Sequence, residues 1–164
     1  MSKAIENFGA PLSAVELYYW RLMSFFDAVG KFNQVRGIYD KLDEWMPPEV
    51  ATVFQKSYGG NRRIVEEKYF ERKGRIERTW GAVLESCNEL GMTYTEQDVR
   101  EFRSLARSTN PETQFRTRMR DKVERLHKAA GKERENCAAG KKPKAIYPQT
   151  LRDLIAWYQT PKKK

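Results

Sequence analysis

The chain has 164 residues, of which 31 are Lys or Arg and 22 are Asp or Glu, so its formal net charge is +9. This length is typical of one domain and suffices to bury a core without disulfides. Two cysteines, Cys87 and Cys137, exclude a disulfide-dense scaffold and a zinc site of four cysteines. The single histidine, His127, excludes chemistry built on histidine pairs. Aromatic residues make up 12% of the chain, which argues against disorder.

The chain is expected to begin with an arm and an aromatic helix. Residues 1–12 form the predicted N-terminal arm. A capping box of Ser13 and Glu16 predicts the start of a helix that continues to Val29. Apolar residues lie on nearly all sides of this helix, which is typical of a buried central element. Gly30 is expected to stop or bend it.

Two further helices are predicted before residue 61. The first continues from Gly30 to Met46 and ends at Pro47-Pro48, because the residue before a proline disfavours the helical conformation. The second of these prolines suits the first turn of a short helix. Gly59-Gly60 is expected to close that helix.

The longest helical pattern runs from Asn61 to Leu90, with apolar residues three, four and seven positions apart. Cys87 lies on this stripe and is expected to be a core thiol. Gly91 fits a C-terminal cap, and Thr95 with Asp98 predicts the start of the next helix.

The last part of the chain predicts a strongly basic helix after Pro111, a basic loop over 131–148, and a C-terminal helix with a Lys tail over 149–164. No segment alternates with the period of a strand, so the sequence predicts an all-α fold. We expect a single helical-bundle domain with its core and a basic face in 13–130, an extended N-terminal arm and a basic C-terminal tail. The predicted core includes Trp20, Phe25, Phe26, Ile76 and Trp80.

Charge is distributed unevenly along the chain. Residues 1–60 hold 6 basic and 7 acidic residues, whereas residues 61–164 hold 25 basic and 15 acidic ones. Such an asymmetry indicates a polyanionic partner. Arginine dominates the basic helix, and its planar guanidinium pairs well with phosphate oxygens. The chain is therefore expected to bind nucleic acid, and these residues leave the choice between DNA and RNA open.

The candidate nucleic-acid-binding residues form two helical groups and one loop group. The first group lies on the helix after Asn61, the second on the basic helix, and the third in the predicted loop. Few of these residues read base edges, so phosphate contacts without sequence specificity are expected. The candidates are Arg62, Arg63, Lys68, Arg72, Arg75, Arg116, Arg118, Arg120, Lys122, Arg125, Lys128, Lys132, Lys141, Lys142 and Lys144.

Catalysis is not expected. The carboxylates from Glu66 to Glu77 alternate with basic residues, and a salt-bridged helix surface explains them. His127 has no partner at metal-ligand spacing and fits a surface or phosphate-contacting role better. The sequence therefore predicts no enzyme activity, no metal and no cofactor.

Three features together resemble the coat proteins of filamentous archaeal viruses. They are the arm Met1 to Leu12, the aromatic helix Ser13 to Val29, and the basic helices near Arg62–Arg78 and Arg116–Arg134. The resemblance is one of architecture and no motif anchors it. It implies a small helical protein that dimerises, wraps double-stranded DNA in a filament and buries the DNA between basic helices. It also implies a structural role in a virion or in the host cytoplasm.

Two alternatives stay open. The chain could be a helical nucleic-acid-binding subunit of a larger nucleoprotein machine, such as a CRISPR effector complex. It could instead be an adaptor or inhibitor that binds an acidic protein surface. The chain is expected to form a homo- or hetero-oligomer. Neither a secretory signal peptide nor a membrane span is predicted, because the most apolar stretch carries Glu16, Arg21 and Asp27.

Overall fold

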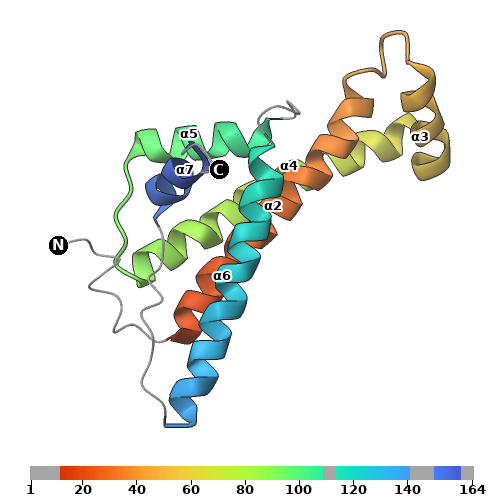
Figure 1. Cartoon of the computed structure of the whole chain (residues 1–164). Helices are drawn as coiled ribbons and strands as arrows, with labels where there is room; N and C mark the ends of the chain where they lie inside the picture. The colour runs from red at the N-terminus through yellow and green to blue at the C-terminus, as the bar shows by residue number, and fades with distance from the viewer. Residues whose placement is uncertain (1–11, 109–113, 141–149, 160–164) are drawn as a thin grey trace, which may run out of the picture.

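The computed structural model describes residues 12–108, 114–140 and 150–159, and this part of the chain consists of α-helices joined by short turns (Figure 1). The predicted all-α fold is confirmed. The helices are α2 (Leu12–Tyr39), α3 (Pro48–Tyr58), α4 (Arg62–Glu89), α5 (Glu96–Arg107), α6 (Phe115–Ala138) and α7 (Leu151–Gln159). Residues 1–11 of the predicted arm and 160–164 of the predicted tail lie outside the described residues. Leu12, the last residue of the predicted arm, begins α2.

Helix α2 is the central element, and both α4 and α6 pack along it (Figure 1). The three helices meet in an aromatic cluster, where the ring centroid of Phe25 lies 4.9 Å from that of Trp80 and Phe26 lies 6.4 Å from Phe115. Helix α5 adds Phe102 to the same cluster. Four of the five predicted core residues are buried there, namely Phe25, Phe26, Ile76 and Trp80.

The prediction that the first helix stops at Gly30 is wrong. Helix α2 continues through Gly30 to Tyr39, and residues 40–46 form turns and irregular backbone, so the predicted end at Met46 is also wrong. A glycine inside a helix costs about 1 kcal/mol relative to alanine. Burial of Val29, Phe32 and Val35 on the same helix outweighs this cost, since each buried side chain of this size contributes about 2 kcal/mol.

Helix α3 lies at one end of the molecule, beside the end of α2 and the start of α4 (Figure 1). It begins at Pro48, as predicted, and closes at Gly59, which adopts the left-handed conformation with φ 61°. This end of the molecule, which we call the tip, has its own small core of Val35, Ile38, Tyr58 and Val65.

The two predicted caps around Gly91 and Thr95 are confirmed. Gly91 has φ 68°, its backbone N–H donates to the Asn88 carbonyl and the Met92 N–H donates to the Cys87 carbonyl, which is a Schellman motif at the end of α4. At the start of α5, the Thr95 side chain accepts from the Asp98 N–H and the Asp98 carboxylate accepts from the Thr95 N–H.

The prediction of a loop from residue 131 is wrong for its first turns. Helix α6 continues through Gly131 to Ala138, because Ala130 and Glu133 are buried and Arg134 forms an ion pair with Glu16 of α2. Residues 141–148 of that predicted loop lie outside the described residues.

Helix α7 packs onto the main core through Leu151, Leu154 and Ile155, which are fully buried. Arg152 anchors it to α5 through ion pairs with Asp98, at 3.0 Å, and with Glu101. No helix in the described ranges is both long and apolar enough to span a bilayer.

Candidate nucleic-acid interface

A row of three neighbouring pockets follows α2, lined by α6 at one end, by α4 at the other end and by both helices in the middle. Three pockets of about 680, 470 and 450 Å³ make up its length, and neighbouring pockets share lining residues. Asp27, Arg120 and Glu124 line the first two, while Trp20, Ser24 and Arg75 line the last two. We call this row of pockets the three-helix groove.

Helical periodicity explains why these side chains share one groove. The floor is a stripe of α2 with residues three or four positions apart, and each wall repeats that spacing on its own helix. The floor stripe consists of Leu17, Trp20, Ser24, Asp27, Lys31 and Gln34. The α4 wall consists of Arg75, Arg78, Thr79 and Ala82, and the α6 wall of Arg116, Thr117, Arg120, Asp121, Glu124, His127 and Lys128.

Basic side chains outnumber acidic ones along the groove. The lining residues include seven Lys or Arg side chains and three carboxylates. The seven are Arg21, Lys31, Arg75, Arg78, Arg116, Arg120 and Lys128, and the three are Asp27, Asp121 and Glu124. The groove is therefore positively charged and attracts anions.

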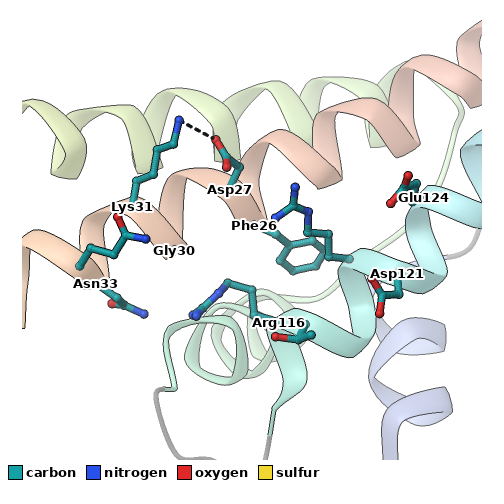
Figure 2. A pocket seen from close by; sticks show the side chains of 11 residues that line it. Phe26, Asp27, Gly30, Lys31, Asn33, Arg116, Asp121 and Glu124 are labelled. Atoms are coloured by element: carbon teal, nitrogen blue, oxygen red, sulfur yellow. Dashed lines mark ion pairs between the residues drawn. The ribbon is translucent and has the colours of Figure 1, made fainter.

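Some of these cations have partners within the chain. Asp27 forms ion pairs with Arg75 of α4 at 3.2 Å and with Lys31 at 3.5 Å, and the latter contact is drawn in Figure 2. Arg21 donates to the hydroxyl of Ser86 at 2.7 Å and thereby ties α2 to α4. These contacts fix the floor to the α4 wall and neutralise part of the charge.

Arg78 and Arg120 are available to bind an anionic ligand. Both are exposed, one on each wall, and among the described residues neither has a carboxylate within 4.0 Å. Each guanidinium presents hydrogen-bond donors that fit phosphate oxygens. They are the strongest candidates for contact with an anionic ligand.

Arg116 lies at the other end of the groove and is partly buried. Figure 2 shows its side chain extending from α6 toward Gly30 and Asn33 of α2. It donates to the Ala106 carbonyl at 3.3 Å, and burial lowers the pKa of its guanidinium. An arginine stays charged at neutral pH even so, and no carboxylate among the described residues lies within ion-pair distance of it.

The structure divides the predicted residues of α4 between two places. Arg75 lines the groove, and Arg72 donates to the Lys31 carbonyl at 2.9 Å beside it. Arg62 lies near the tip instead, where it pairs with Asp43 at 2.7 Å and its hydrogen bond lowers the pKa of that carboxyl. Arg63 and Lys68 pair with carboxylates of their own helix, as expected of a salt-bridged surface.

The predicted residues of α6 are also divided. Arg116, Arg120 and Lys128 line the groove, whereas the other four do not. Arg118 lies over the ring of Tyr158 of α7, 5.7 Å from its centroid, and Arg125 donates to the Asp121 carbonyl of its own helix. The four residues outside the groove are Arg118, Lys122, Arg125 and Lys132. Lys141, Lys142 and Lys144 lie outside the described residues.

Three basic groove residues, Arg21, Lys31 and Arg78, and the indole of Trp20 are absent from the sequence-based candidates. Trp20 is 56% exposed, so its prediction as a core residue is wrong. The spacing of Trp20, Ser24, Asp27 and Lys31 is a signal that could have found a polar stripe on the central helix. Arg78 follows Arg75 by one helical turn and could have been found in the same way.

The groove offers charge, hydrogen-bond donors and one exposed indole. Within the described residues no three His, Cys, Asp or Glu side chains cluster closely enough to hold a metal ion. Cys87 is buried away from the groove, as predicted, and burial raises the pKa of its thiol to about 12. Binding of an anionic ligand is the chemistry that these groups support best.

Comparisons of the chain with protein-family models, curated proteins and solved structures gave no match. The function of the groove is therefore inferred from its own residues.

Proposed function

We propose that the chain binds nucleic acid through the three-helix groove, without catalysis and without reading sequence. One observation carries this proposal. Arg78 and Arg120 stand exposed on opposite walls of a basic groove and have no carboxylate partner among the described residues. Arginines in that state gain new charge-assisted hydrogen bonds when phosphate enters.

Sequence indifference follows from the chemistry of the lining. Arginine and lysine contact phosphates, which position a protein on nucleic acid but carry no sequence information. Release of counterions then makes affinity fall steeply with salt concentration. Asp27 reduces the dependence of affinity on salt concentration, because it already neutralises part of the charge of Arg75 and Lys31.

The coat role implied by the resemblance requires that the protein also polymerises on the nucleic acid that it binds. Electron microscopy of the protein mixed with long duplex DNA tests that addition directly. Regular filaments would support the coat role. Discrete complexes that do not polymerise would favour a subunit of a larger nucleoprotein machine.

The groove is tested with the double variant Arg78→Ala/Arg120→Ala. We expect the dissociation constant for nucleic acid at low salt to rise roughly tenfold or more. The slope of log affinity against log salt should become shallower by about one to two, because two phosphate contacts are lost. Fluorescence anisotropy with labelled single-stranded and duplex oligonucleotides over a salt series measures both quantities.

The matched control is Lys56→Ala/Arg100→Ala, which removes the same charge from exposed sites outside the groove. This control should weaken binding less than threefold. Equal losses in the two double variants would assign binding to net charge rather than to the groove. Absence of binding by the unaltered protein at low salt would refute nucleic-acid binding and favour an acidic protein partner.

A further inference from the structure

Trp20 is an aromatic side chain exposed within the groove. It is 56% exposed and lines two of the three pockets, whereas its neighbour Tyr19 and the following aromatic residue Phe25 are fully buried. An indole on a surface leaves a large apolar face in water. That face is available to a flat ligand that enters the groove.

The surroundings of Trp20 are cationic. Arg78 lines one of its pockets, and Arg120 lines the other together with Lys128, which forms an ion pair with Glu124 at 3.4 Å. The His127 ring lies 6.0 Å away by ring centroids, with the planes tilted by 44°, so the two rings do not stack face to face. An exposed aromatic between basic side chains is the arrangement by which proteins bind single-stranded nucleic acid.

We propose that the groove takes single-stranded nucleic acid, with an unpaired base stacked on Trp20 and the flanking phosphates held by Arg78 and Arg120. This inference rests on the proposed function and specifies its substrate. The flat faces of bases are stacked on one another inside a duplex, whereas a single strand can turn them toward an aromatic side chain. The inference departs from the preference for duplex DNA that the resemblance implied.

The length of the groove suits a short strand. Its floor runs from Leu17 to Gln34, which at the rise of an α-helix is about 25 Å. At the spacing of about 3.4 Å per nucleotide along one strand of a duplex, roughly seven nucleotides cover that length, and a more extended strand needs fewer. Because every base has a π-face, stacking on one indole tolerates any sequence.

The test compares oligothymidylate of about 16 nucleotides, the upper site size of a single-strand-binding domain, with the same strand paired to oligoadenylate. We expect the unaltered protein to bind the single strand at least tenfold more tightly. Trp20→Ala should weaken single-strand binding roughly 5- to 100-fold, because alanine cannot stack on a base. It should change duplex binding less than threefold. Intrinsic tryptophan fluorescence should be quenched by the single strand, and Trp20→Ala should lose most of that quenching.

Two control variants separate stacking from structural damage. Trp45→Ala removes another exposed indole, 78% exposed and outside the groove, and should leave both affinities unchanged. Trp20→Phe keeps an aromatic face and should retain part of the single-strand affinity. Circular dichroism should report the same helix content and thermal midpoint for all three variants, because both indoles are exposed.

The outcomes separate the two proposals. If Trp20→Ala binds the single strand as tightly as the unaltered protein, the stacking role is refuted. If the unaltered protein binds single strand and duplex equally well, the substrate inference fails while phosphate binding by the groove stands. If neither oligonucleotide binds at low salt, the proposed function fails as well.

Discussion

Cys87 shows how burial changes the chemistry of one residue. Its side chain is 1% exposed in the main core, and burial raises the pKa of the thiol to about 12. The charged thiolate loses its hydration in an apolar environment, so the neutral form is favoured. Tyr18 has a raised pKa for the same main reason, with a smaller contribution from Cys87. Cys87 is consequently a packing residue rather than a nucleophile.

The raised pKa of Cys87 makes stability depend on pH. Between pH 9 and about pH 12 the thiol ionises in the unfolded chain but stays neutral in the folded one, so rising pH favours unfolding. Cys87→Ala lacks this effect. We expect the variant to be less stable at pH 7 by about 1 kcal/mol, as for a small loss of core volume. The difference in the free energy of unfolding between the unaltered protein and Cys87→Ala should become smaller above pH 9. Urea unfolding followed by circular dichroism at several pH values measures this difference, and a constant difference would contradict the buried thiol.

At the scale of the element, a glycine has different effects inside a helix and at the end of a helix. Gly81 lies inside α4 with no neighbouring atom within 4 Å of the position of a Cβ. Gly59 lies at the end of α3 with φ 61°, a conformation that side chains with a Cβ disfavour. Glycine therefore lowers the stability of α4 at position 81, whereas the left-handed conformation at position 59 favours glycine.

Substitution of alanine at these two glycines should change stability in opposite directions. Gly81→Ala should raise the free energy of unfolding by about 0.5–1 kcal/mol, through better helix propensity and lower entropy of the unfolded chain. Gly59→Ala should lower it by about 1 kcal/mol, because alanine is strained in the left-handed conformation. Chemical denaturation of both variants measures the two changes. A loss of stability in Gly81→Ala would show that a partner helix approaches this position.

Helix length is the feature of the elements that the sequence predicted least well. The caps at Gly59, Gly91 and Thr95 are predicted correctly, because each depends on a side chain or a left-handed glycine within a few residues. The continuation of α2 through Gly30 and of α6 through Gly131 was missed. The continuation of α2 depends on packing against α3 and α4, and that of α6 on packing against α2, so each depends on residues distant in the sequence.

At the scale of the whole molecule, the described residues form two hydrophobic cores of unequal size. The main core joins α2, α4, α5, α6 and α7, whereas the tip holds only a few buried residues between α3 and the adjoining ends of α2 and α4. Segments with few buried contacts open locally at a lower free energy than the global unfolding reaction. The tip is therefore expected to open before the main core.

Hydrogen exchange should separate these two parts. Backbone amides of α3 should exchange faster than those in the middle of α2. Ile38→Ala should accelerate exchange in α3 further, because truncation of a buried isoleucine costs about 2–5 kcal/mol. Exchange in α7 should change little, since α7 packs on the other core. Equal acceleration in α3 and α7 would indicate that both cores unfold as one unit.

The amino-acid sequence alone determined the helical class, the C-terminal caps of α3 and α4, the N-terminal cap of α5, four of the five predicted core residues and the basic character of the second half. These properties depend on periodicity, local capping and composition, which can be read within one segment. Only the tertiary structure decided that Trp20 faces a groove, that Arg118 lies against α7 while Arg120 lines the groove, and that Arg78 belongs with Arg120. Those outcomes depend on which face of each helix its neighbours cover, and the neighbours come from distant parts of the chain.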